Sequence, residues 1–390
     1  MQNVEFSLAG GSALIRQLRR LGLLRWIPQN LTGQIMLAVL IAWVPLLLFT
    51  AHEGMALGGK VQIPFLADLV QYARFLVALP CAIAMGEYIN PRLRSVLNSF
   101  LKSGIVSRKD FVCFESAISR ARTLAGSIIS EWVILVLVYL YTSLGLYRHT
   151  SEGISSWNHP GHGALVPQTA AGWWFLWVSM PLFLFAWFVW VWRLGIWAYL
   201  LFRISRLELS VVALHPDQVG GLNFVHVGMR RFSVLVFAIS SILCASIGEQ
   251  LVFNGASLRS YELELASLFP ICLGIILGPL VVFTPILVRS KLEHWAMYGP
   301  LAGRYVRAFQ EKWISHPDSL HRTLLGSPDI QSLADMRNSY AGIAQTRTWL
   351  PNRTTIGIFA VAYVLPALPL LTSVISLRQL LSEVYTLLLK

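Results

Sequence analysis

Seven stretches of the chain are apolar over nearly their whole length. Each is close to the roughly 20 residues that an α-helix needs to cross a bilayer. They are Leu31–Ala51, Leu69–Ile89, Ser127–Tyr147, Gly172–Trp192, Phe232–Phe253, Ser267–Val288 and Thr354–Ser376. The pattern therefore predicts an all-α fold, a polytopic transmembrane helix bundle of about seven spans with helical cytoplasmic extensions.

The last apolar stretch continues beyond Ser376 almost to the C-terminus. Pro366 and Pro369 interrupt it, and proline breaks or kinks the interior of a helix. After these prolines, leucine and valine recur at helical spacing. We therefore expect a final span followed by an amphipathic helix that lies on the outer membrane surface. The alternative is a re-entrant hairpin, which would return the C-terminus to the inside.

The composition excludes several classes of protein. Only 13% of the 390 residues are charged, 55% are hydrophobic, and the mean hydropathy is +0.60. About 25% charged residues is usual in a soluble globular domain. A soluble enzyme, a disordered chain and a disulfide scaffold are therefore excluded, and the lipid bilayer is the expected surrounding.

The excess of basic residues is explained by topology. The chain has 31 Lys and Arg against 19 Asp and Glu, a net charge of +12. Most of the basic residues lie in the N-terminal arm and in every second loop, whereas the intervening loops carry only Lys60, Arg148 and Arg259. Because Lys and Arg accumulate in cytoplasmic loops, the N-terminus is predicted to be cytoplasmic, and no nucleic-acid partner is expected.

These patterns divide the chain into four parts. Residues 1–30 form an amphipathic cytoplasmic arm, and residues 31–288 form a bundle of six spans with cytoplasmic loops at 90–126 and 193–231. Residues 289–353 form a cytoplasmic helical loop, and residues 354–390 hold the last span and the C-terminal amphipathic helix.

Ionisable side chains within the spans are costly there and are often functional. The topology sorts them into an outer layer of Asp68, Arg74 and Glu249 and an inner layer of Glu87, Glu131 and Arg193. One interpretation is a polar path with charged constrictions, as in a channel or transporter. The alternative is that the charges lock helices together or lie in water at the interface. Arg74 is expected either to extend toward the membrane surface or to pair with Glu249.

A second candidate lies in a predicted cytoplasmic loop, in the sequence His215-Pro-Asp217-x-x-Gly220-Gly221-Leu222. His and Asp side chains are able to serve catalysis, but Asp217 is also suited to capping a helix, and paired glycines allow a tight turn. A structural elbow beneath the membrane is therefore the competing interpretation. The sequence has no C-x-x-C pair and no common enzyme motif, so no metal site, catalytic residue or cofactor is predicted.

Three segments carry a resemblance to a known group of proteins. They are Arg74-Phe-Leu-Val-Ala-Leu-Pro80 with Glu87, His215 to Leu222, and Leu325-Gly-Ser-x-Asp-Ile-Gln-Ser-Leu-Ala-Asp335. Together they resemble segments of a family of uncharacterised bacterial polytopic inner-membrane proteins with no assigned activity. The resemblance implies a multi-pass location in a bacterial inner membrane and implies nothing about activity.

Three functions are compatible with these features. The first is a channel or transporter for an ion or small solute, with the intramembrane charges along its path, either alone or as a homo-oligomer. The second is a membrane accessory, sensor or regulatory protein without transport activity. The third is a membrane-embedded enzyme that uses the loop around His215. The intramembrane charges favour the first.

Overall fold

The computed structural model of the chain describes residues 6–8, 16–17, 19, 28–58, 60–145, 156–158, 169–315 and 327–371. Most of the N-terminal arm and the expected C-terminal amphipathic helix lie outside these residues. Within them the chain is helical and has no strands, only two isolated bridges.

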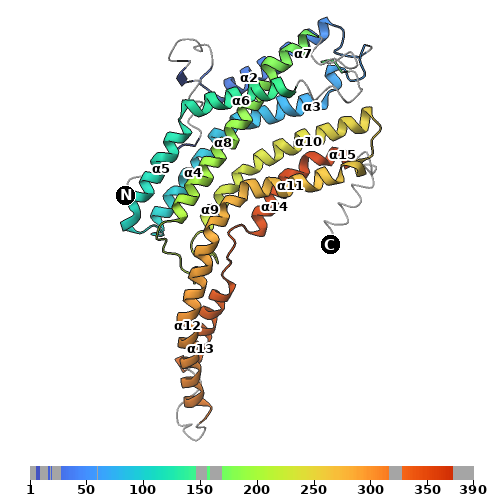
Figure 1. Ribbon diagram of the computed structural model, residues 1–390. Coiled ribbons are helices and arrows are strands. Elements are labelled where there is room, and N and C mark those ends of the chain that lie inside the picture. The colour runs from blue at the N-terminus through green and yellow to red at the C-terminus, as the bar shows by residue number, and fades with distance from the viewer. Residues whose placement is uncertain are drawn as a thin grey trace.

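The helices follow one another in a simple up-and-down order (Figure 1). The chain begins with α2 (Leu31–His52), followed by α3 (Leu69–Gln71), the π-helical segment η2 (Tyr72–Ala78) and α4 (Leu79–Lys102). Next come α5 (Phe111–Ala125), α6 (Ile128–Gly145), α7 (Ala170–Trp174), the π-helical segment η5 (Phe175–Ser179) and α8 (Met180–Ser205). The fifth span is formed by α9 (Asn223–Met229) and α10 (Ser233–Phe253). The rest consists of α11 (Glu262–Leu277), η8 (Gly278–Phe283), α12 (Thr284–Trp313), α13 (Pro328–Gln345), α14 (Arg353–Val364), η10 (Leu365–Ala367) and α15 (Leu368–Leu371).

Six of the described helices are long and apolar enough to cross a membrane. A seventh span is obtained if α5 with its leading turn and α6 are counted as one, although they meet at an angle of 44°. The prediction of an all-α, polytopic bundle of about seven spans is therefore confirmed.

The second and fourth spans are among those that run further than their apolar stretches predicted. The second continues to Lys102 and the fourth to Ser205, because charged residues end an apolar run without ending a helix. Their extensions pack with α5 and α9 around buried residues such as Phe100, Phe114 and Trp197. We call this end of the bundle the hairpin end, because the hairpin of α12 and α13 projects from it. The opposite end holds His52, Ala170 and Phe253.

The loop predicted at 289–353 is mostly a helical hairpin. Helix α12 continues the sixth span without interruption, and α13 returns beside it (Figure 1). The hairpin projects away from the bundle and does not join the layer formed by α4, α5, α8 and α9. One contact between its two helices is the side chain of Asp329, which accepts hydrogen bonds from Lys312 at 2.5 Å and from Trp313 at 3.0 Å.

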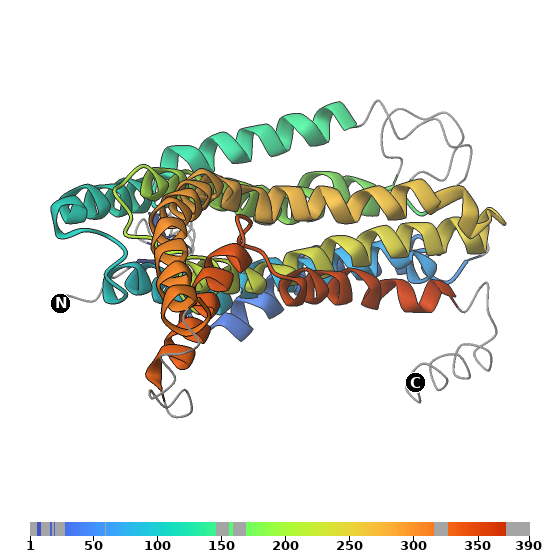
Figure 2. The ribbon, with the colours of Figure 1, turned by 90° about the horizontal axis from the view of Figure 1, so that it is seen from below.

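Helix α6 lies at the edge of the bundle, as seen from below in Figure 2. It packs mainly on α8 and leaves apolar side chains exposed along its length, among them Ile129, Val136 and Leu140. Such a face is stable where hydrocarbon covers it, which agrees with a helix that lies in a membrane.

Candidate functional site

Asp68 is the centre of a buried polar cluster at the start of the second span. It caps the N-terminus of α3, and one of its oxygens accepts the backbone N–H of Gln71 at 3.0 Å. Its other oxygen accepts the side-chain amide of Gln71 at 3.1 Å and the indole N–H of Trp157 at 2.8 Å. Both Asp68 and Trp157 are buried. Three donors from two parts of the chain therefore hold this carboxylate in place.

Arg74 is joined to Asp68 through Gln71. The Arg74 guanidinium donates to the side-chain oxygen of Gln71 at 3.0 Å. Its central carbon lies 5.8 Å from the ring centroids of both Phe175 and Phe183. A cation next to two aromatic faces is stabilised by their quadrupoles where water is excluded. Arg74 therefore points into the bundle and not toward the membrane surface.

Glu249 reaches the same place from α10, which packs against α3 and η2. One of its oxygens accepts the backbone N–H of Val70 at 2.9 Å, and its carboxyl group interacts electrostatically with that of Asp68. Arg74 interacts electrostatically with both carboxyl groups. The structure thus brings together the three residues Asp68, Arg74 and Glu249, which form the outer layer named from the sequence.

The cluster lies where two π-helical segments face each other. Arg74 belongs to η2, and Phe175 belongs to η5; the ring of Phe75 packs edge-on against that of Phe175 at 6.3 Å. Each segment ends two residues before a proline, Pro80 in one case and Pro181 in the other. Proline has no N–H, so the helix before it loses a hydrogen bond and has reason to change its register. π-Helical turns are rare and are often found at functional sites.

The second π-helical segment is fixed to α2 at both of its ends. The Trp174 indole donates to the carbonyl of Ile41 at 3.0 Å, and the Ser179 hydroxyl donates to that of Ala42 at 2.7 Å. These bonds hold the aromatic wall beside Arg74 in one position.

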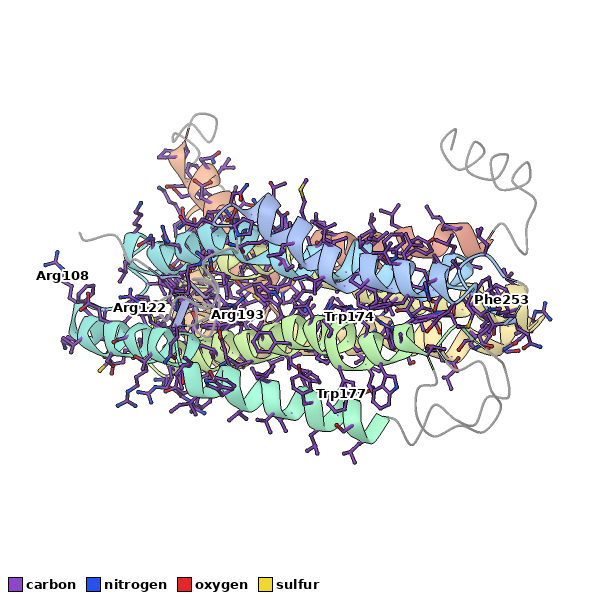
Figure 3. All side chains as sticks on the ribbon, turned by 90° about the horizontal axis from the view of Figure 1, so that it is seen from above. Arg108, Arg122, Trp174, Trp177, Arg193 and Phe253 are labelled. Carbon is purple, nitrogen blue, oxygen red and sulfur yellow. The ribbon has the colours of Figure 1, made fainter. Side chains whose placement is uncertain are left out.

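Two residues of the predicted inner layer also meet. Glu131 of α6 and Arg193 of α8 are both buried and interact electrostatically. The Arg193 guanidinium also lies 5.1 Å from the ring centroid of Trp190. Figure 3 shows Arg193 closer to the end marked by Arg122 than to the end marked by Phe253. Glu87 is exposed, and no described contact joins it to this pair.

The loop from His215 to Leu222 is arranged around the carboxylate of Asp217. This group accepts backbone N–H groups from Val219 at 2.9 Å, Gly221 at 3.0 Å and Asn223 at 3.1 Å. The His215 ring lies 2.9 Å from the same carboxylate. Partial burial opposes ionisation, but these hydrogen bonds outweigh it and lower the pKa of Asp217.

Both glycines of this loop have backbones that other residues rarely adopt. Gly220 has φ +66° and Gly221 has φ +91°, and a Cβ atom on Gly220 would lie 2.2 Å from Val211. The loop is also bound to the base of the hairpin, because the N–H of Arg347 donates to the carbonyl of Gln218 at 2.8 Å. The geometry is that of a structural elbow, with the acceptor oxygens of Asp217 directed at the loop itself.

Sequence reasoning missed the residues that complete the outer cluster. The spacing of Asp68 and Gln71 is that of a capping box, and this signal was available in the sequence. Trp157 lies in a loop far along the chain, and nothing in the sequence points to it. Phe175 and Phe183 could not be distinguished in the sequence from the many other aromatic residues of the fourth span.

Among the residues that the structure describes, no three or more His, Cys, Asp or Glu side chains are grouped so that they could hold a metal ion. Comparison with protein families, curated proteins and solved structures finds no match to the chain. The function is therefore argued from the cluster itself.

Proposed function

We propose that the protein is a channel or transporter for an ion or small solute in a bacterial inner membrane, with Asp68, Arg74 and Glu249 in its path. The single observation that carries this proposal is the convergence of these three ionisable groups, Asp68 buried and the other two half-buried, where the second and fifth spans meet beside two π-helical turns. Ionisable groups at such depth are expensive and are characteristic of ion and proton pathways.

The charges of the cluster suggest what it binds. Two carboxylates and one guanidinium sum to one negative charge, and a net charge is costly to bury. The two carboxyl groups also interact with each other, and two carboxylates close together repel unless a proton or a cation compensates them. One proton or one monovalent cation at this position makes the cluster neutral. The geometry thus favours a cation or a proton as the transported or coupling species.

The proposed orientation has the hairpin end in the cytoplasm. Basic residues are concentrated at this end, including Arg108, Arg120 and Arg122 on the segment of α5 and its leading turn. The positive-inside tendency of membrane proteins supports this orientation, and it agrees with a cytoplasmic N-terminus.

The test is flux into liposomes that contain the purified protein. A pH-sensitive dye reports proton entry after a potassium diffusion potential is applied. Separate arms measure the entry of sodium or of potassium in place of protons. Asp68→Asn and Glu249→Gln keep the size of the side chains and are expected to reduce flux at least ten-fold. Glu264→Gln, on an exposed residue at the start of α11, is the matched control and should behave as the wild type.

If the wild type moves none of the three cations and no common anion or small solute, the proposal is wrong. It is also wrong if Glu264→Gln lowers flux as much as Glu249→Gln, because a local role of the cluster would then be absent.

A second candidate is a membrane accessory, sensor or regulatory protein without transport activity. The projecting α12–α13 hairpin favours it, because Met297 and Ile314 are about 60% exposed on an arm that contacts the bundle only at its base. A photo-crosslinker at Met297 would then give one defined adduct in cells, while liposomes would show no flux. For the third possibility, an enzyme, the loop offers no support, because Asp217 is engaged by its own backbone.

A further inference from the structure

A short segment, residues 156–158, packs on the buried polar cluster at the end of the bundle opposite the hairpin end. The side chain of Trp157 has an exposed fraction of 0%, although it comes from a loop. Its ring lies edge-on to two others, with centroid distances of 5.2 Å to Phe65 and 5.5 Å to Phe175. The segment is bound to Thr169, which caps α7, and Figure 1 shows α7 and α3 at this end of the bundle.

The backbone bonds described for this segment are isolated ones. The N–H of Trp157 donates to the carbonyl of Ile63 at 3.2 Å, and the hydroxyl of Thr169 donates to the carbonyl of Trp157 at 3.2 Å. Ile63 and Ser156 form an isolated bridge. Isolated backbone pairs lack the neighbouring bonds that make a helix or a sheet cooperative. The segment therefore detaches at a lower cost than a residue inside a helix.

The indole of Trp157 occupies an oxygen of Asp68 that a cation would need. This oxygen accepts the indole N–H at 2.8 Å and the side-chain amide of Gln71 at 3.1 Å. Both N–H groups present the positive ends of their dipoles, so they repel a cation from this oxygen while both remain. Gln71 lies within α3 and is also bound by Arg74, whereas Trp157 comes from a loop. Trp157 is therefore the donor that can leave without disturbing a helix.

We propose that Trp157 is the gate through which a cation reaches Asp68 from the end of the bundle opposite the hairpin end. In the structure the gate is closed, because the ring packs between Phe65 and Phe175 while the indole N–H holds the carboxylate. When residues 156–158 move away, one cation takes the place of the indole N–H at the Asp68 oxygen. The inference rests on the proposed cation path, and it adds the point of entry and the residue that controls it.

The test measures how readily water-soluble reagents reach Asp68, and it does not depend on transport. Full-length protein in a neutral detergent is treated with a water-soluble carbodiimide and glycine ethyl ester, and the labelled carboxyl groups are quantified by peptide mass spectrometry. Trp157→Phe keeps an aromatic ring and removes the indole N–H, so it should label Asp68 about ten-fold faster than the wild type. Glu131, which is buried in α6, should stay slow and so report that the bundle remains folded.

Two further variants make the test specific. Trp173→Phe is the matched control, because Trp173 is exposed on α7 at the same end of the bundle, and it should label Asp68 at the wild-type rate. Ile63→Cys with Ser156→Cys joins the two bridge partners by a disulfide, since paired backbone positions are close enough for one. Its oxidised form should label Asp68 more slowly than its reduced form. Both forms are the same chain, so a folding defect in the variant does not produce this difference.

The gate is overturned if Trp157→Phe labels Asp68 at the wild-type rate, if Trp173→Phe speeds labelling as much, or if the disulfide changes nothing. Should Trp157→Phe also speed the labelling of Glu131, the disulfide variant decides. The liposome flux separates this result from the proposed function. If Trp157→Phe exposes Asp68 but the wild type shows no flux, the transport function is wrong and the movement of Trp157 stands. If flux is present and the labelling of Asp68 does not change, the gate is wrong and the transport function stands.

Discussion

Replacing Arg74 by methionine removes a guanidinium that attracts two carboxyl groups and lies against two phenylalanine rings, while it keeps a side chain of similar length. The change leaves Asp68 and Glu249 facing each other without a cation. The Arg74 guanidinium donates to Gln71 at 3.0 Å and attracts both carboxyl groups, and loss of a hydrogen bond from a charged group costs about 1.5–3 kcal/mol of the free energy of unfolding. Asp68 keeps its bonds to Gln71 and Trp157, so we expect a loss of about 2 kcal/mol.

A second substitution separates the charge effect from the loss of packing. Glu249→Gln keeps an oxygen for the N–H of Val70 and removes one of the two facing carboxyl groups. In the double variant one carboxyl group remains where the Arg74→Met variant has two. The double variant should therefore be more stable than Arg74→Met alone, by about 1–2 kcal/mol.

Stability is measured by unfolding the purified protein with increasing sodium dodecyl sulfate and following tryptophan fluorescence. Arg259→Met is the control, because Arg259 is exposed on the turn between α10 and α11, near the same end of the bundle. It should leave the unfolding midpoint unchanged. If Arg74→Met behaves like Arg259→Met, or if the losses of the two single variants simply add, the three groups do not form one electrostatic unit.

The remaining predictions concern the elbow and the first π-helical turn. The pKa of Asp217 is lower in the folded protein than its unfolded value of about 3.9, so its contribution to stability is present above about pH 4 and is lost as the pH falls through the folded pKa. Asp217→Ala should therefore lower the thermal midpoint at pH 7, with a difference from wild type that shrinks below about pH 4. Gly220→Ala should cost about 1–3 kcal/mol, because it adds a contact with Val211 to an unfavourable φ. Gly104→Ala is its matched control in the same chemical unfolding, with φ +69° and open space around it. Pro80→Ala should restore a backbone donor in the second span and so remove the cause of the π-helical turn. A cysteine placed at position 74 should then turn away from the bundle, and its labelling should increase.

Much of the fold was predictable because hydrophobicity is a property of each residue that needs no partner. The apolar stretch Phe232–Phe253 differs from α10 by one residue at its start. The extent of α4 and of α12 was not predictable in this way, since the sequence becomes charged where the helix leaves the apolar region and the backbone continues regardless. The end of a span and the end of a helix are different quantities, and hydropathy reports only the first.

The candidate site was predictable in depth but not in direction. Counting residues along each span placed Asp68, Arg74 and Glu249 in one layer, and the structure brings them together. The same counting placed Glu87 with Glu131, yet Glu87 is exposed. Depth fixes the position of a residue along the helix axis, whereas contact also depends on the face of the helix, which changes by about 100° for each residue.

The face on which Arg74 lies depends on the π-helical turn in which it sits. A π-helical turn is equivalent to one extra residue in an α-helix, so it rotates the residues on one side of it by about 100° relative to those on the other. Without such a turn between Val70 and Pro80, the surface that packs against α10 and the surface that meets η5 would not be the ones observed. The turn ends two residues before a proline, and the facing segment η5 ends at the same distance before Pro181. The direction of the charged side chain therefore follows from a missing backbone N–H several residues away, and a change at Pro80 would act on the cluster without touching any of its members.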